Sequence, residues 1–392
     1  MKKASFDGVL CFGGEDWWYH NHGHIDLQMM REFSNRVPVL YINSLGMRIP
    51  KASQNSAFLK RIIRKLKSIS KGYIRIRNNF SVLSLLSIPG YNQTLFIKNL
   101  MIWTIKQSIK KSGMKNPIIW VALPSCEFLL DSIPNQLVLY QRTDRFETED
   151  DVDYNKARKL DLDLKKKADL TIFCTRHVFN EEKHECKEVL FLDHGVDYID
   201  FKKAGDMRQK PVELQVEGIK KIIGFVGGLD PITIDQNLII EIVKALPEYL
   251  FYFVGHDNFE GNWCNFDNAL FLGKKPYSEV AKYMAAADVL IMPWLNNEWI
   301  KACNPIKLKE YLAIGRPVVT TYFQELDYYK NLVSIANSPE EFIFTLKNAR
   351  SSDELIKAQR DRVEKETWKN KNSEVENLII KLIIKKGESL ES

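Results

Sequence analysis

The sequence predicts an α/β protein made of two doubly wound domains that face each other across a cleft. The chain of 392 residues is long enough to enclose two separate hydrophobic cores. Short apolar runs alternate with segments of helical periodicity along most of its length, which is typical of parallel sheets covered by helices. A polar stretch, residues 201–218, separates two such series and is the expected linker.

The first series, residues 1–200, predicts the N-terminal domain. We expect strands at residues 9–12, 37–42, 118–122, 137–140, 170–174 and 189–192, and helices at 25–33 and 155–167. Ligands of doubly wound domains bind outside the carboxyl ends of the strands, so the loops after these runs are candidate sites.

The second series, residues 219–365, predicts the C-terminal domain, and residues 366–392 form a final segment. We expect strands at residues 222–226, 250–254, 269–272, 289–292 and 318–320, and a helix at 238–246. If residues 375–384 form a helix, apolar side chains lie on almost every side of it. This predicts a last helix that packs on the protein, a partner or a membrane.

Charge is distributed unevenly along the chain. The net charge is +6, yet the interval between Glu32 and Glu127 holds sixteen Lys and Arg residues and no acidic residue. This asymmetry predicts an anionic partner for the first domain. Residues 58–69 have the pattern of an interfacial amphipathic helix, or of a surface helix packed on its own domain. We expect a membrane surface and no nucleic acid, because no recognised nucleic-acid module accompanies the charge.

The six cysteines include no C-x-x-C pair, which predicts reduced thiols and neither a disulfide framework nor a zinc site. No signal peptide or apolar run of about 20 residues is visible. The protein is therefore expected in the cytoplasm, peripherally associated with the inner face of the cell membrane.

The most informative motif is PIKLKEYLAIGRPVV at residues 305–319. Asn304 as N-cap and Pro305 in the first turn predict a helix that begins just after a buried strand. Its N-terminus offers free N–H groups and a positive dipole to an anion. Lys307 could then pair with a diphosphate, and Glu310 could accept hydrogen bonds from two ribose hydroxyls. An ordinary βαβ unit with a surface Lys and Glu fits the pattern equally well.

This motif resembles the donor-binding block of GT-B glycosyltransferases in the bacterial polysaccharide and glycolipid branch (families 4 and 1), where P-x-K-x-x-E-Y-x-A-x-G-x-P-V-V recurs. Xanthan-type glucuronosyltransferases are more loosely similar. In the family the matching lysine contacts the donor diphosphate and the glutamate the ribose. The resemblance implies two Rossmann-like domains and a C-terminal helix that crosses back onto the first. Ala302 stands where many retaining members have a second glutamate, so inversion and retention both stay open.

Further donor-binding residues are expected on neighbouring loops. Gly227-Gly228 ends a strand and lets the backbone approach a phosphate closely. Leu229 stands next, where many relatives have a basic residue, so Lys307 or a basic residue from elsewhere must supply the charge. By resemblance, the loop with Lys274 and Tyr277 surrounds the nucleobase. The expected donor set is Gly227, Gly228, Lys274, Tyr277, Asn304, Pro305, Lys307 and Glu310.

The loop at residues 13–26 of the first domain carries candidate acceptor groups. Trp17 and Trp18 offer flat faces to a sugar, and His20 and His22 offer hydrogen bonds. Alternating histidines invite a metal, but the resemblance implies an enzyme that stabilises its leaving group without one. Alternatively, the loop clasps its own domain.

A general base is needed for inverting transfer, to take the proton of the acceptor hydroxyl. Asp144 follows a buried strand in a segment similar to the Y-x-x-x-D turn of this branch, and it is the first candidate. Asp16 and His24 are the others.

Together these features predict a glycosyltransferase that moves a sugar from a nucleotide-diphosphate donor, with UDP-sugars favoured, to a glycan or a lipid-pyrophosphate-linked acceptor. The product would belong to a bacterial surface polysaccharide or glycolipid. The donor is a substrate, and no cofactor is expected. Two alternatives share the architecture: a UDP-N-acetylhexosamine 2-epimerase, and a non-catalytic scaffold of a polysaccharide assembly complex.

Overall fold

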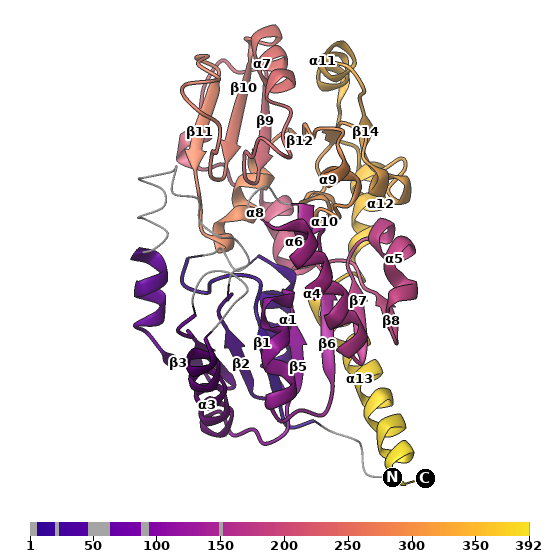
Figure 1. Ribbon diagram of the computed structural model, residues 1–392. Coiled ribbons are helices and arrows are strands. Elements are labelled where there is room, and N and C mark those ends of the chain that lie inside the picture. The colour runs from indigo at the N-terminus through magenta and orange to yellow at the C-terminus, as the bar shows by residue number, and fades with distance from the viewer. Residues whose placement is uncertain (1–5, 20–22, 46–62, 88–93, 149–151, 392) are drawn as a thin grey trace. The chain divides into compact units, whose positions relative to one another are not determined.

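The computed structural model describes residues 6–19, 23–45, 63–87, 94–148 and 152–391, which divide into two compact units (Figure 1). Unit 1 comprises the chain up to Asp193 together with the chain from Lys371 onward, and unit 2 comprises His194–Asn370. Each unit contains a sheet of mainly parallel strands with its own hydrophobic core.

Unit 1 contains an eight-stranded sheet in the order β3-β4-β2-β1-β5-β6-β7-β8, in which only β3 is antiparallel to its neighbour. Its strands are β1 (Val9–Phe12), β2 (Val39–Ile42), β3 (Tyr73–Arg77), β4 (Phe80–Leu83), β5 (Ile118–Val121), β6 (Val138–Arg142), β7 (Leu170–Phe173) and β8 (Val189–Phe191). Its helices include α1 (Ile25–Phe33), α3 (Leu95–Lys111), α4 (Tyr154–Lys167) and α5 (Arg176–Glu182). The hairpin of β3 and β4 was not predicted, although the alternation of cations and apolar residues in β3 is typical of a strand with one exposed face.

Unit 2 contains a six-stranded parallel sheet in the order β11-β10-β9-β12-β13-β14. Its strands are β9 (Lys221–Val226), β10 (Tyr249–Val254), β11 (Ala269–Gly273), β12 (Val289–Met292), β13 (Val318–Thr320) and β14 (Ser334–Ile335). Its helices are α6 (Tyr198–Met207), α7 (Gln236–Ala245), α8 (Tyr277–Ala286), α9 (Glu298–Lys301), α10 (Ile306–Ile314), α11 (Pro339–Asn348) and α12 (Asp353–Val363).

The segment predicted as a linker, residues 201–218, differs from that expectation. It contains most of α6 and the 3-10 turn Val212–Leu214, and it belongs to unit 2. The stretch reads as polar because α6 buries only a narrow stripe that includes Phe201 and Gly205. A Cβ atom on Gly205 would lie 2.1 Å from the Ile314 carbonyl oxygen, so the glycine allows α6 to approach α10 closely.

The long final helix α13 (Trp368–Glu391) begins in unit 2 and continues in unit 1. Trp368 is buried beside Gly195, whereas Asn372 donates a hydrogen bond to the Met29 carbonyl at 3.3 Å. Arg36 binds both Asn372 and Glu376. Two doubly wound units and this helix confirm the predicted fold class. Among the described residues, no helix combines the length and apolar character that a membrane crossing requires.

Candidate functional site

The candidate site of unit 2 is built on the N-terminus of α10. Pro305 occupies the N-cap position with an extended ψ of 119°, and its side chain makes no capping hydrogen bond. The prediction that Asn304 caps this helix is therefore wrong, because the helix begins one residue later than expected. Within the described residues, the backbone N–H groups of Ile306 and Lys307 have no acceptor. The positive end of α10 is thus available to an anion.

Lys307 projects a cation from this first turn into aromatic surroundings. Its Nζ lies 4.6 Å from the ring centroid of Phe225 and 5.7 Å from that of Trp294. In the part of the chain that the structure describes, this ammonium has no hydrogen bond and no carboxylate within ion-pair distance. Burial lowers the pKa of Lys307 to about 8, although the negative charge of Glu310 raises it in part. An unpaired, desolvated cation beside free helix amides is an arrangement that favours binding of an anion.

Glu310 lies one turn further along α10 and is buried. Its Oε1 accepts a hydrogen bond from the Tyr277 hydroxyl at 3.0 Å, at the start of α8. Burial raises the pKa of Glu310 to about 7; the Tyr277 hydrogen bond opposes this rise and nearby Asp197 adds to it. The carboxylate therefore keeps acceptor capacity beyond its one hydroxyl partner, as recognition of a diol requires.

The turn Gly227-Gly228 after β9 is overlaid by two basic side chains. A Cβ atom on Gly227 would lie 2.1 Å from Lys307 Nζ, and one on Gly228 would lie 2.8 Å from His256 Cε1. A larger residue at either position would displace the lysine or the imidazole, so the two glycines leave room for both side chains. The Gly228 N–H has no acceptor among the described residues. The turn therefore presents an amide donor between two basic groups.

His256 was not predicted as a site residue. It lies in the loop after β10, where its carbonyl accepts a hydrogen bond from the Leu229 N–H at 2.9 Å. Gly255-His256 at the end of a buried run was the sequence signal that could have revealed it. The sequence around Leu229 left two sources of positive charge open, Lys307 or a basic residue from elsewhere, and His256 is a candidate for the second.

Tyr311 couples α10 to the glycine turn. The strand β12 pairs with β9 only at Ile223 and Gly224, so the end of β9 lacks a neighbour on that side. The Tyr311 hydroxyl accepts a hydrogen bond from the Val226 N–H at 3.0 Å in place of that neighbour. This bond fixes the last peptide before the turn relative to the helix that carries Lys307 and Glu310.

The structure brings five of the eight expected donor residues into one cluster: Gly227, Gly228, Tyr277, Lys307 and Glu310. Pro305 contributes by starting α10, and Asn304 is buried beside it without capping the helix. Lys274 lies exposed in the loop after β11, and a role at the nucleobase stays a prediction.

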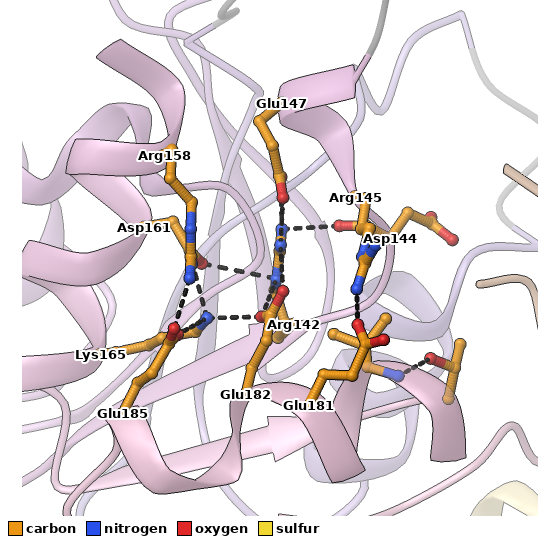
Figure 2. A network of polar contacts seen from close by, with 12 residues as sticks. Arg142, Asp144, Arg145, Glu147, Arg158, Asp161, Lys165, Glu181, Glu182 and Glu185 are labelled. Carbon is orange, nitrogen blue, oxygen red and sulfur yellow. Dashed lines mark hydrogen bonds and ion pairs between the residues drawn. The ribbon is translucent and has the colours of Figure 1, made fainter. Parts of the chain in front are cut away.

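In unit 1, Asp144 follows β6 and is partly buried. Its backbone carbonyl accepts a hydrogen bond from Arg142 Nη1 at 2.8 Å, while its carboxylate points away from that arginine (Figure 2). Burial raises the pKa of the Cys174 thiol, and the charges of Asp144, Asp193 and Asp26 raise it further. Three carboxylates therefore gather near the carboxyl edge of this sheet, of which only Asp144 was predicted.

The aromatic residues of the loop at 13–26 pack on their own unit. The Trp17 ring lies 4.9 Å from the Phe80 ring, centroid to centroid, and the Trp18 indole donates to Ser84 Oγ at 3.2 Å. Lys71 Nζ lies 3.9 Å from the centroid of the Trp18 ring. These contacts support the alternative that the loop clasps its own domain, so an acceptor role for Trp17 and Trp18 stays a prediction.

The remaining candidates of this loop are polar. Asp16 Oδ1 accepts a hydrogen bond from the Trp18 N–H at 3.0 Å. His24 precedes α1, and its Nε2 lies 3.6 Å from Glu15 Oε1. His20 and His22 lie outside the described residues.

A buried ion network lies beside Asp144 (Figure 2). Arg142 is fully buried and donates to both oxygens of Glu147, at 2.9 and 2.7 Å, and to both oxygens of Glu182, at 3.1 and 3.2 Å. Its other members are Arg158, Asp161, Lys165 and Glu185.

Asp161, Glu182 and Glu185 approach one another as metal ligands do, within 4.8 Å. Lys165 Nζ, however, lies 2.8, 2.5 and 2.7 Å from their oxygens. The ammonium takes the position that a metal ion would need, so the network is structural.

Comparison with known sequences relates most of unit 2 to a known family. Residues 220–349 match the model of the family described as glycosyl transferases group 1. The chain is also 31% identical over 140 residues to TuaH of Bacillus subtilis, which is described as a teichuronic acid biosynthesis glycosyltransferase. That match covers 34% of this chain and only 34% of the relative.

Solved structures resemble the chain over nearly its whole length. HepE from Anabaena, in complex with UDP, has a TM-score of 0.63 at 12% identity and covers 96% of this chain and 99% of its own. A glycosyltransferase from Rickettsia africae ESF-5 has a TM-score of 0.63 at 12% identity, and the match covers 97% of this chain and 100% of that protein. The α,α-trehalose 6-phosphate synthase of Burkholderia multivorans has a TM-score of 0.60 at 12% identity, and the match covers 99% of this chain and 100% of the synthase. The family match lies within unit 2, and the likeness to these solved structures over nearly the whole chain shows that the chain has the GT-B fold.

Proposed function

We propose that the protein transfers a sugar from a nucleoside-diphosphate donor, with UDP-sugars favoured, to a glycan or lipid-linked acceptor at the inner face of the cell membrane. One observation carries the proposal: the Lys307 ammonium, which has no counterion among the described residues, lies against the Gly227-Gly228 turn at the start of α10. HepE was solved with UDP and with UDP-glucose, which supports the choice of nucleotide. The description of TuaH supports a surface polysaccharide as the product.

In this proposal, the donor diphosphate binds where the free donors of unit 2 converge. The amides of Ile306, Lys307 and Gly228 donate to its oxygens, and Lys307 neutralises its charge. His256 supplies a second basic group at the other side of the glycine turn. As the sugar–phosphate bond breaks, negative charge grows on the departing diphosphate, and fixed donors stabilise that charge without having to reorganise.

Glu310 would hold the ribose. Its carboxylate already accepts from Tyr277 and has capacity for two ribose hydroxyls. Two new donors to the ionised form would lower its pKa from the value of about 7 in the free protein, so donor binding would release a proton near neutral pH.

Nucleotide selectivity tests the donor site. We expect UDP to raise the melting temperature more than GDP, CDP or dTDP, because a ligand that binds only the folded state stabilises it, by ~2.7 kcal/mol at a hundred times its dissociation constant. Differential scanning fluorimetry with each nucleotide provides the measurement. If none of the four raises the melting temperature, the donor site is wrong. UDP binding without turnover on any acceptor would favour the scaffold alternative.

Asp144 is the proposed general base, because it is a partly buried carboxylate at the carboxyl edge of the unit 1 sheet. We expect Asp144→Asn to lower turnover by about 10²- to 10⁴-fold, the usual contribution of a base, without changing UDP affinity. UDP release from UDP-sugars, with a panel of glycan and polyprenyl-pyrophosphate-linked acceptors, measures this. Asp16→Asn is the matched control and should keep near-wild-type turnover. If Asp16→Asn lowers turnover and Asp144→Asn does not, Asp16 is the general base instead.

A further inference from the structure

Helix α3 of unit 1, which is labelled in Figure 1, has large exposed apolar side chains on the face opposite its buried residues. Leu95, Phe96, Leu100 and Trp103 are 74%, 77%, 37% and 62% exposed, respectively. Phe96, Leu100 and Trp103 follow one another at helical spacing and therefore form a single stripe. The opposite face, with Met101 and Ile105, is buried in the core of unit 1. The stripe is therefore not needed to attach α3 to its own unit, and contiguous exposed apolar surface of this kind marks an interaction site.

The same helix face becomes basic toward its C-terminal end. Lys106, Lys110 and Lys111 are exposed there, and Lys111 lies over the ring of Tyr73 on the edge strand β3. The helical residues 63–69, which lead into β3, repeat the combination with exposed Ile63 and Leu66 beside exposed cations. No acidic residue occurs anywhere between Glu32 and Glu127 to balance these charges.

We propose that α3 docks the protein on an anionic lipid bilayer. Leu95, Phe96, Leu100 and Trp103 would enter the boundary between headgroups and acyl chains, while the three lysines bind lipid phosphates. A bilayer fits better than a folded protein partner because every charged residue of α3 and of residues 63–69 is a cation, and because the stripe contains an exposed tryptophan, a residue that favours the membrane interface. The proposal names the contact surface of the proposed lipid-linked reaction, but it does not depend on the donor site.

Vesicle binding by the full-length protein tests this surface. We expect wild-type protein to co-sediment with phosphatidylcholine vesicles that contain phosphatidylglycerol, and much less with pure phosphatidylcholine. Phe96→Ser with Trp103→Ser should weaken binding at least tenfold. The matched control, Tyr154→Ser with Phe344→Ser, removes two other exposed aromatic residues, from α4 and α11, and should bind as wild type does. In both variants, the melting temperature and its increase on addition of UDP should equal those of the wild type. A loss of vesicle binding can then not be due to misfolding or to a damaged donor site.

Quenching by brominated lipid gives a second, independent readout. Bromine in the acyl chains should quench part of the tryptophan fluorescence of the wild type, and Trp103→Phe should remove that part without loss of binding. Three outcomes would overturn the proposal: equal binding to neutral and anionic vesicles, unimpaired binding of the α3 variant, or quenching that Trp103→Phe does not change.

Discussion

Replacement of Lys307 by methionine is expected to weaken UDP binding by about 10- to 100-fold while raising the stability of the free protein. The loss follows because a charged hydrogen bond to the diphosphate contributes about 1.5–3 kcal/mol. The gain follows because the wild-type ammonium is desolvated and lacks an ion-pair partner among the described residues. Isothermal titration calorimetry with UDP and chemical denaturation measure the two effects.

The pH dependence of protein stability and of UDP affinity also tests the role of Lys307. The pKa of Lys307 is about 8 in the folded protein, below its unfolded value, so desolvation of the charged form reduces stability below pH 8. This penalty fades as the pH rises from about 8 toward the unfolded pKa of about 10.5. The stability gain of Lys307→Met should fade over the same interval, and wild-type UDP affinity should fall by up to about tenfold per pH unit above pH 8. Lys301→Met, which removes an exposed lysine from α9, is the control and should change neither property. Unchanged UDP affinity in Lys307→Met would refute the donor site.

Replacement of Arg142 by methionine is expected to destabilise unit 1 by about 3–5 kcal/mol. Breaking a buried ion pair leaves an uncompensated charge. Here Glu147 and Glu182 would each lose two hydrogen bonds from Arg142, one to each carboxylate oxygen. Urea denaturation followed by circular dichroism measures the change.

The network also predicts acid sensitivity. Burial opposes ionisation of Glu182, but Arg142 and Lys165 lower its pKa to about 2. The stabilisation that Glu182 contributes is present above its unfolded pKa of about 4.5 and is lost as the pH falls toward 2.

Arg145→Met provides the matched control three residues away. Arg145 pairs with Glu181 at a partly exposed position, where an ion pair contributes about 0–1 kcal/mol. Equal destabilisation by the two substitutions would show that burial of the Arg142 network is not what stabilises this unit.

The sequence was informative where burial alone dictates residue type. Parallel strands buried on both faces must be apolar throughout, so β9 and β12 were predicted within one residue of their ends. Lys307 and Glu310 could be proposed as a pair because one helical turn separates them in the sequence, and the family resemblance favoured a donor role for both. Tyr277 was placed near the donor by resemblance only.

Contacts between distant segments could not be predicted in this way. The Tyr277–Glu310 hydrogen bond joins residues 33 positions apart, and His256 meets Gly228 only because β9 and β10 are neighbours in the sheet. The ion network was missed for a related reason. Its helix α4 reads as a charged surface helix, although Asp161 and Lys165 on it are fully buried against Arg142.

The antiparallel edge strand β3 has a consequence for handling the protein in solution. An open sheet edge can pair with the edge of another chain and start aggregation. On β3, Arg75 and Arg77 are exposed on either side of Ile76, so two molecules that meet edge to edge bring like charges together. Removing these arginines would therefore expose an unprotected strand, and precipitation of such a variant could be mistaken for loss of lipid affinity. Lysines of α3 can be neutralised without this effect, which makes them the better choice for reducing the positive charge of unit 1.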